Sequence, residues 1–359
     1  MTTQHRFPYN WTLKDAVFTK DKGKVFSCFA CGGGSTMGYK LAGFDVIGHN
    51  DIDKKMIEVY KANHNPKFSF LESITTFAKR KDLPKELYNL DILDGSPPCS
   101  SFSMAGNREK DWGKEKVFRE GQAEQVLDTL FFDFIDLAKE LQPKVVVAEN
   151  VSGLMMGAAK EYVKKIYLSF QEAGYELRIE PYLLDASKMG VPQRRKRVFF
   201  IALRNDLAGQ FMEQVDMFQT APKLDLEFNE KEILFGEIFK KNGIGKKLSE
   251  RYLMAWNNKI ESDNDLGDIF NRIENKVINF NAKLIKKNKV SNTIASGGNF
   301  ITFDEPRQLT KTEFIKVGSF PLDYNFLGIQ PQYLIGMSVP PVMTAQIATE
   351  VFNQWISKI

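Results

Sequence analysis

The stretch VFSCFACGGGSTMG, residues 25–38, decides the fold, because an apolar run is followed directly by a glycine-rich turn and then by a helical pattern. Residues 25–30 are predicted as a β-strand and residues 37–42 as a helix. Glycines permit positive φ angles and close approach of the backbone to a ligand, and a helix start offers free N–H groups to an anionic group. The stretch therefore predicts a strand–turn–helix unit with a ligand site at the end of the strand.

The same alternation continues along the chain to residue 203. Short apolar, β-branched or aromatic runs alternate with stretches whose apolar residues recur at helical spacing. Strands are predicted at residues 25–30, 44–49, 91–95, 145–148, 176–184 and 197–203, and helices at residues 37–42, 54–62, 124–141 and 160–173. A parallel sheet covered by helices produces this pattern, so we predict a doubly wound α/β domain.

The composition and the periodicity of the sequence change after residue 204. From residue 205 to about residue 291 the chain is rich in Lys, Asn, Glu and Phe, with weak periodicity and no further alternation of strand and helix. Helical spacing returns at residues 342–355, in a helix that we expect to pack back on the first domain. We predict a first domain of residues 1–204, completed by a C-terminal helix at about residues 334–359, and a smaller domain of residues 205–333.

Composition limits the class of protein. The chain has 359 residues, of which 43% are hydrophobic, and this supports a substantial buried core. Its apolar runs are too short to cross a bilayer and residues 1–10 lack the apolar segment of a signal peptide, so a cytoplasmic protein with no membrane segment is expected. Cys28, Cys31 and Cys99 form neither a disulfide framework nor paired zinc motifs, so no metal is expected, and Cys28 and Cys31 are interpreted as buried thiols at a strand end.

Positive charge is concentrated locally. The net charge is only +4, which favours a polyanionic partner weakly. Residues 194–197 form a basic run, and Lys240, Lys241, Lys246 and Lys247 flank a glycine-containing turn. Such runs are often solvated surface, so their significance depends on the motifs around them.

The turn at residues 29–38 favours a ribose-bearing ligand without a pyrophosphate. Asp51, at the end of the second predicted strand, lies about 20 residues further on, where an acidic residue would meet a ribose diol. The turn has neither the lysine of a GxxxxGK[ST] motif nor GxGxxG spacing. S-adenosyl-L-methionine (AdoMet) is therefore the cofactor that we expect.

Chemically active residue types follow three predicted strands. Cys99 lies in GSPPCSSFS, residues 95–103, at the carboxyl edge of the sheet, where open α/β folds bind ligands. The apolar run at residues 145–147 brings the carboxylate of Glu149 to the same edge. Gln193, Arg195 and Arg197 alternate along an extended segment and so share one face.

The order of these motifs resembles the DNA (cytosine-5)-methyltransferase family, of the bacterial or phage restriction-modification type, over nearly the whole chain. The similar segments are Pro98-Cys99 with Phe102-Ser103, Glu149-Asn150-Val151, the QxRxR pattern of residues 193–197, RQLTKTE at residues 307–313 and FPLDY at residues 320–324. The resemblance implies a Rossmann-like class I methyltransferase domain and a smaller target-recognition domain.

The resemblance also assigns site residues. It implies catalytic roles for Cys99, Glu149, Arg195 and Arg197, and AdoMet contacts for Phe29, Gly33, Gly34, Asp51, Ile52, Ile74, Pro98 and Ser338. The chain departs from the family pattern at Cys31 (usually glycine), Ser73 (usually aspartate), Ser100 (usually glutamine) and Met337 (usually asparagine). These departures leave Cys99, Glu149 and Arg197 intact.

In this family the reaction begins when a cysteine thiolate adds to C6 of a cytosine that has been flipped out of duplex DNA. By resemblance, Cys99 is that nucleophile, Arg195 and Arg197 favour its thiolate and hold the cytosine O2, and Glu149 stabilises charge at N3 and the exocyclic amine. Residues 104–122 are interpreted as a lid, and residues 205–300 as the region that reads the sequence. We expect a monomer that acts on double-stranded DNA, with any cognate restriction endonuclease acting independently.

Three alternatives share part of this pattern. A tRNA cytosine-5 methyltransferase would share the framework, but that branch resembles a group with a Cys-Phe-Thr tripeptide in the recognition region, and no cysteine follows Cys99. A catalytically silent nucleic-acid-binding module would explain the substitutions at Cys31, Ser73 and Met337 but not the intact catalytic set. A nucleotide-dependent oxidoreductase would use the glycine-rich turn and leave Cys99 without a role.

Overall fold

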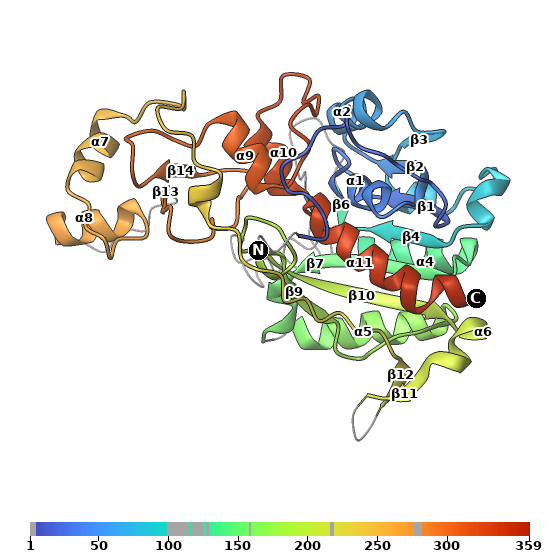
Figure 1. Cartoon of the computed structure of the whole chain (residues 1–359). Coiled ribbons are helices and arrows are strands. Elements are labelled where there is room, and N and C mark those ends of the chain that lie inside the picture. The colour runs from blue at the N-terminus through green and yellow to red at the C-terminus, as the bar shows by residue number, and fades with distance from the viewer. Residues whose placement is uncertain are drawn as a thin grey trace. The chain divides into compact units, whose positions relative to one another are not determined.

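The structure, a computed structural model, describes residues 5–98, 115–116, 125–126, 129–157, 159–215, 219–275 and 282–359 (Figure 1). The chain forms two compact units, each made of separated segments. The sheet unit comprises residues 17–184, 196–227 and 344–359, and the small unit comprises residues 1–16, 185–195 and 228–343.

The sheet unit contains one large mixed sheet with the strand order β3-β2-β1-β4-β7-β10-β8, and β9 pairs with β10. β1, β2, β3, β4 and β7 are parallel, whereas β10 is antiparallel to both β7 and β8. The strands are β1 (Lys24–Cys28), β2 (Asp45–Asp51), β3 (Phe68–Leu71), β4 (Ile92–Gly95), β7 (Val145–Val151), β8 (Tyr175–Glu176), β9 (Tyr182–Asp185) and β10 (Lys196–Arg204). The carboxyl ends of the five parallel strands therefore meet at one edge.

Helices cover both faces of this sheet. They are α1 (Gly34–Leu41), α2 (Lys54–His64), α3 (Ile74–Phe77), α4 (Leu130–Leu141), α5 (Ala159–Glu172), α6 (Asn205–Ala208) and α11 (Pro341–Gln354). The helices α3, α4 and α5 share one core cluster with alternate residues of the strands, such as Phe26 and Leu93. On the other side, Phe44 packs against Tyr39 of α1 and Phe352 of α11, with ring centroids 6.0 and 6.1 Å apart.

The central strand β7 follows from its sequence. Val145, Val146, Val147 and Ala148 are all buried, as expected for a parallel strand covered on both faces. Two short antiparallel pairs accompany the sheet, β5 (Glu115–Lys116) with β6 (Gln125–Val126) and β11 (Met212–Gln214) with β12 (Thr220–Pro222).

The small unit has its own core. It contains α7 (Glu250–Asn257), α8 (Leu266–Glu274), the parallel strands β13 (Ala282–Ile285) and β14 (Asn299–Thr302), α9 (Lys311–Val317) and α10 (Pro331–Met337). Ala255 of α7, Ile269 and Phe270 of α8 and Leu284 of β13 form one buried cluster. Between residues 205 and 302 the described helices and strands follow in the order α6, β11, β12, α7, α8, β13 and β14, so single strands and helices do not alternate there, as the sequence indicates.

Most predicted elements of the sheet unit are confirmed within a few residues, but two are not. The strand predicted at residues 176–184 is interrupted between β8 and β9, where Pro181 has no N–H to donate and the N–H of Ile179 bonds to Gln219 at 3.0 Å. The helix predicted from residue 124 begins at Leu130, because residues 125–126 form β6. The C-terminal helix predicted at residues 342–355 is α11.

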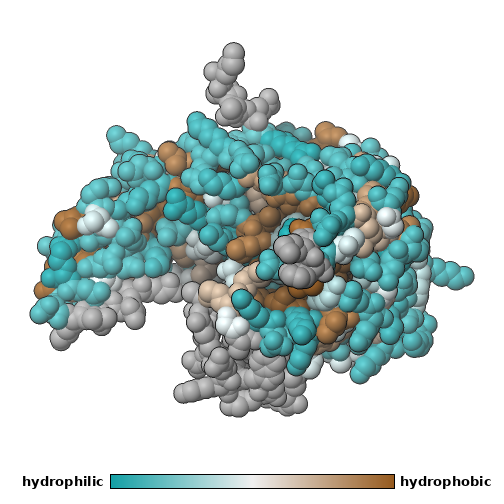
Figure 2. All heavy atoms as spheres, turned by 90° about the horizontal axis from the view of Figure 1, so that it is seen from below, coloured by the Kyte–Doolittle hydropathy of each residue, from teal (hydrophilic) through white to brown (hydrophobic). Residues whose placement is uncertain are grey.

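The compact units do not follow the predicted division at residue 204. The sheet unit continues through α6, β11 and β12 to residue 227, and residues 5–16 belong to the small unit, where the indole of Trp11 donates to the Ser319 carbonyl at 3.1 Å. Hydrophilic residues predominate on the face drawn in Figure 2, and hydrophobic residues form only interrupted patches there.

Candidate active site

Asp51, the last residue of β2, holds the glycine-rich turn between β1 and α1. Its Oδ2 accepts a hydrogen bond from the N–H of Cys31 at 2.7 Å, and its Oδ1 accepts one from the N–H of Asp53 at 2.8 Å. Phe29, Cys31 and Gly33 have φ angles of 51°, 49° and 89°. Positive φ is unfavourable for the first two residues, so the bond to Asp51 helps to fix a turn that the local sequence alone would not favour.

The start of α1 has no side-chain cap, because its N-cap residue is Gly33. A Cβ at position 33 would lie 2.1 Å from Nε2 of His64, so space as well as the positive φ requires glycine there. The first N–H groups of Gly34 and the residues after it therefore depend on another acceptor. These N–H groups and the neighbouring carboxylate of Asp51 suit a ligand with a carboxylate and a ribose diol, so the residues present fit AdoMet.

The other residues predicted to bind cofactor in the sheet unit lie near the ends of its strands. Ile52 follows β2 and is half-buried, Ile74 begins α3 and is buried, and Pro98 lies three residues after the end of β4. Ser73, which stands where the family usually has aspartate, caps α3 by accepting a hydrogen bond from the N–H of Thr76 at 3.2 Å. That hydroxyl therefore stabilises a helix start in this structure.

Asp94 is a buried acid that sequence reasoning did not single out. It lies on β4 and accepts hydrogen bonds from Ser27 Oγ at 2.6 Å, Ser35 Oγ at 2.8 Å and Tyr39 Oη at 3.2 Å. Burial raises the pKa of its carboxyl to about 6, and the negative charge of Glu149 acts in the same direction. Asp94 thereby connects β1 and the first turns of α1 to β4, the strand that leads to the predicted nucleophile.

Two of the predicted catalytic residues are brought together. Glu149 on β7 and Arg197 on β10 form an ion pair, with Nε and Oε1 2.8 Å apart and side chains 12% and 16% exposed. The antiparallel register pairs Phe199 with Glu149 and Arg197 with Val151, so the two charged side chains reach each other diagonally across the strands. A second donor of Arg197, Nη1, bonds to the Lys196 carbonyl at 2.8 Å.

Asn150 connects β7 to the segment before the predicted nucleophile. Its amide nitrogen donates to the carbonyl of Pro97 at 3.0 Å, and its Oδ1 accepts from the N–H of Val151 at 2.8 Å. Cys99 follows two residues after Pro97 but lies outside the described residues, as does most of the segment 104–122 that was predicted to be a lid. The acidic motif thus positions backbone as well as charge, and from the sequence alone Asn150 was recognisable only as part of that motif.

Arg195 and Ser338 belong to the small unit. The guanidinium of Arg195 is buried and donates to the carbonyl oxygens of Ile294 at 3.1 Å and Gly336 at 3.0 Å. Gln193, also buried, donates to the Val317 carbonyl at 3.2 Å. Ser338 Oγ donates to the Leu334 carbonyl at 2.8 Å. These bonds tie separated segments of the small unit together, and both Arg195 and Ser338 are held by contacts within that unit.

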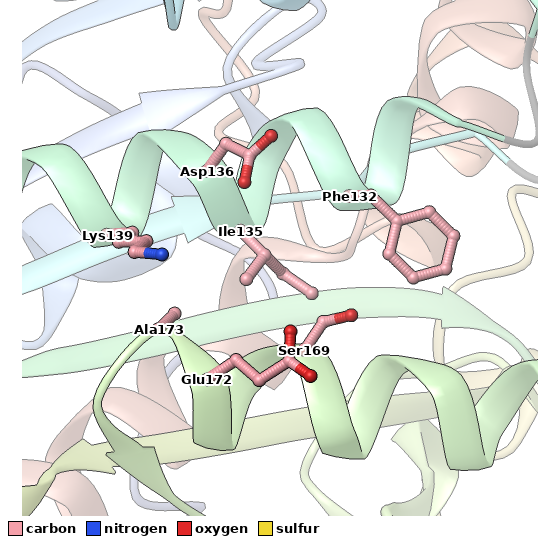
Figure 3. Close-up of a pocket in the computed structure, with 7 residues that line it drawn as sticks. All are labelled: Phe132, Ile135, Asp136, Lys139, Ser169, Glu172 and Ala173. Carbon is pink, nitrogen blue, oxygen red and sulfur yellow. The ribbon is translucent and has the colours of Figure 1, made fainter.

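A small pocket between α4 and α5 lies apart from these residues (Figure 3). Phe132 and Ile135 of α4 point toward Ser169 and Glu172 of α5. Its lining residues Lys139 and Ala173 lie near the carboxyl ends of α4 and α5, the helices that precede β7 and β8, whereas the predicted site is at the carboxyl ends of the parallel strands. No helix in the described ranges is long and apolar enough to span a membrane.

The sheet and its helices define a class I methyltransferase fold, which confirms the predicted fold class. Similar solved structures include an E. coli protein described as a DNA modification methyltransferase encoded within a prophage, with a TM-score of 0.62 and 20% identity over 92% of this chain and 99% of that chain. Spodoptera frugiperda DNMT2 aligns with a TM-score of 0.61 and 18% identity over 92% of this chain and 99% of that chain.

Comparison of sequences gives the family. The chain belongs to the C-5 cytosine-specific DNA methylase family, whose model matches residues 23–353, and this confirms the resemblance seen in the motifs. Type II methyltransferase M.FnuDI of Fusobacterium nucleatum is 36% identical over 184 residues, which are 51% of this chain and 48% of that protein. Type II methyltransferase M1.HphI of Haemophilus parahaemolyticus is 26% identical over 340 residues, 90% of this chain and 85% of that protein. The match to M.FnuDI thus spans about half the length of that relative.

Proposed function

We propose that the protein transfers a methyl group from AdoMet to C5 of a flipped-out cytosine in a short, specific sequence of duplex DNA. The observation that carries the proposal is the set of groups at one edge of the sheet. Asp51, which holds the turn, ends β2, and Pro97, which leads into Cys99, follows β4. Glu149 lies near the carboxyl end of β7 and pairs with Arg197 near the start of the antiparallel strand β10, so these groups all lie at the same edge. Membership of the C-5 cytosine-specific DNA methylase family supports the same reaction.

The proposed reaction assigns a step to each residue. The thiolate of Cys99 adds to C6 of the cytosine, which raises electron density at C5. C5 would take the methyl group as the bond between that group and the sulfur of its donor breaks. A base would then remove the proton from C5, and the electron pair of that C–H bond would restore the C5–C6 double bond as the thiolate leaves. Glu149 would accept a hydrogen bond from the exocyclic amine and supply a proton to N3 as the thiolate adds, and Arg197 would orient Glu149 and add positive charge near O2.

The cofactor supplies an electrophilic methyl group when bound. Asp51 would accept hydrogen bonds from the ribose diol, and the N–H groups at the start of α1 would bind the carboxylate. Phe29, Gly33, Gly34, Ile52, Ile74 and Pro98 would line the same site, and the family resemblance adds Ser338 to the residues that would bind the cofactor. Arg195 would act from the small unit by holding the backbone around Ile294 and Gly336.

Catalysis and recognition of the target would be divided between the two units. The sheet unit, with α11, would be catalytic, and residues within 205–333 would recognise the target. Double-stranded DNA is the proposed partner, bound by a monomer in the cytoplasm, and a cognate restriction endonuclease would act as a separate protein. The named Type II relatives support this setting.

The test uses tritiated AdoMet with unmethylated duplex DNA and, separately, with tRNA. We expect label in DNA alone, and bisulfite sequencing should place it at cytosines within one short sequence. The Cys99→Ser variant should lose the label while binding AdoMet as the unaltered chain does, which calorimetry measures. Label in tRNA alone would show that tRNA, and not DNA, is the substrate. Retained DNA binding without any label would identify the protein as a catalytically silent binding module.

A further inference from the structure

The loop of residues 240–247 in the small unit, Lys-Lys-Asn-Gly-Ile-Gly-Lys-Lys, presents one apolar side chain among four cations. Ile244, at its centre, is 97% exposed, more than any other large hydrophobic residue in the part of the chain that the structure describes. An isolated exposed isoleucine is common on protein surfaces and carries no meaning alone. The surroundings of Ile244 give it significance.

The four lysines are available to a partner. Lys240, Lys241, Lys246 and Lys247 are all exposed, and none forms an ion pair with a carboxylate within the described ranges. Nearby lysines of the same unit behave differently, since Lys283 pairs with Asp265 at 2.8 Å and Lys287 with Asp304 at 3.1 Å. The loop therefore concentrates uncompensated positive charge on both sides of Ile244.

The loop is also fixed in shape. The N–H of Lys240 bonds to Glu313 Oε1 at 2.9 Å, and the carbonyl of Lys240 accepts from Arg307 Nη2 at 2.8 Å. Further along, the N–H of Asn242 bonds to Glu305 Oε1 at 2.7 Å, and the carbonyl of Lys246 accepts from the N–H of Gln308 at 3.0 Å. Both ends of the loop are thus attached to residues 305–313.

The two glycines explain why the tip points outward. A Cβ on Gly243 would approach Thr310 Cγ2 to 2.8 Å, and a Cβ on Gly245 would approach the Gln308 carbonyl oxygen to 2.0 Å. The backbone on each side of Ile244 therefore packs closely on the segment beneath it. Because the backbone is held there, Ile244 remains exposed, and contact with a partner is the way in which its apolar surface can be buried.

We propose that the loop of residues 240–247 binds duplex DNA, with its lysines on phosphates and Ile244 against base edges in a groove. Phosphates on both sides of a groove match a loop that carries cations on both sides of an apolar tip, and apolar side chains contact thymine methyl groups or wedge between base steps. A lipid surface would also attract lysines, but a single isoleucine buries too little apolar area for stable insertion. The inference rests on the proposed function and names the residues by which the small unit would hold its substrate.

The proposal separates affinity from selectivity. Removing Lys241 and Lys246 by substitution with alanine should weaken binding to all duplexes alike and reduce the slope of log K against log salt concentration by about 1.8, roughly 0.9 for each lost phosphate contact. Ile244→Ala should leave that slope unchanged. It should weaken binding roughly ten- to fifty-fold for the duplex that carries the target sequence, and should not weaken binding to other duplexes. All three side chains are exposed, so we expect these variants to fold.

The experiment measures binding of the full chain to two short duplexes by fluorescence anisotropy across a salt series. One duplex carries the sequence found by bisulfite mapping, and the other has the same base composition in scrambled order. Ile260→Ala, which alters an isoleucine 48% exposed in the same unit, and Lys283→Ala, which removes a paired lysine, are the matched controls. Neither control should change selectivity between the duplexes.

Failure of the inference can be told apart from failure of the proposed function. Suppose that the unaltered chain methylates DNA and that the Ile244→Ala variant binds and methylates the target equally well. This loop then does not read DNA, although the proposed methyl transfer is still supported. If the unaltered chain methylates no DNA, the proposed function itself fails. Binding to vesicles that contain phosphatidylserine, lost in the Ile244→Ala variant while DNA binding is unchanged, would assign the loop to a lipid surface and overturn the inference.

Discussion

Asp94 is a carboxylic acid whose protonation is coupled to folding. Its pKa is raised from its ordinary value of 3.8 to about 6, first because the side chain is buried. The folded state therefore keeps this proton to a higher pH than the unfolded chain does and binds more protons between about pH 4 and 6. The free energy of unfolding should fall as pH rises through this window, by up to about 3 kcal/mol from this group.

The Asp94→Asn variant removes that titration. Asparagine can accept from two of the three hydroxyl groups and donate to a rotated one, so the variant should fold. Urea unfolding at a series of pH values should show the unaltered chain losing stability relative to Asp94→Asn between about pH 4 and 6. Parallel curves for the two proteins would contradict the prediction, and Asp136→Asn, at an exposed position of α4, controls for the loss of a surface carboxyl.

The ion pair of Glu149 and Arg197 permits a sharper test of catalysis. Glu149→Gln keeps the size of the side chain but removes its charge and its capacity to act as an acid or base. We expect methyl transfer to fall by about 10²- to 10⁴-fold, while AdoMet affinity stays unchanged because Asp51 and the turn are not altered. Initial rates and equilibrium titration measure the two effects, and Glu172→Gln, at an exposed position of α5, is the control. An equal loss of cofactor affinity would show that Glu149 acts on binding.

At the scale of elements, the start of α9 contains a buried ion pair. Arg307 contacts Glu313 through Nη1 and Nη2 at 2.8 and 3.0 Å, and Glu313 closes a capping box with Thr310. Glu313 is 1% exposed, so it depends on these partners for its charge. The RQLTKTE segment that resembled a family motif is therefore a structural feature that joins a helix start to the loop of residues 240–247.

Substitution of Arg307 should destabilise this part of the chain. Arg307→Ala leaves the Glu313 carboxylate buried and uncompensated, at a cost of about 3–5 kcal/mol in the free energy of unfolding. Adding Glu313→Gln should recover part of the loss, because the uncompensated charge is then gone. Urea denaturation measures both, and Lys283→Ala, which breaks a more exposed ion pair, should cost no more than about 1 kcal/mol. A loss for Arg307→Ala as small as that of the control would contradict the assignment.

The elements also show what the sequence could and could not predict. β1, β4, β7 and β10 were predictable because buried strands read as apolar runs bounded by turns, and Glu149 and Asp51 because a carboxylate after such a run has no packing role. Asp94 was missed because it stands inside a strand and its three partners, Ser27, Ser35 and Tyr39, look like ordinary polar residues. Pro181 is a local signal of the interruption between β8 and β9, but the hydrogen bond that holds Ile179 comes from Gln219, a residue distant in sequence.

For the whole molecule, the boundaries of the two units are difficult to predict from the sequence, because the chain passes from one unit to the other and back. The bonds of His5 to Glu230 at 2.7 Å and of the Leu13 N–H to Asp323 at 2.6 Å bring the N-terminal segment into the small unit. Residues 185–195 join that unit between two strands of the sheet. Composition and periodicity describe residues that are neighbours along the chain. These contacts join residues more than 200 positions apart, so neither composition nor periodicity could give the boundaries of the units.

The two units allow a prediction about the intact chain. Asp51, Asp94 and the turn before α1 all belong to the sheet unit, so AdoMet at about 100 times its Kd should stabilise that unit by about 2.7 kcal/mol. Hydrogen exchange followed by mass spectrometry should then show slower exchange in β1, α1 and β4, with little change in α7 and α8 of the small unit. Asp51→Ala should abolish the slowing. Equal slowing in both units would show that they open together, and no slowing in β1 or α1 would contradict the assignment of the cofactor site to this sheet.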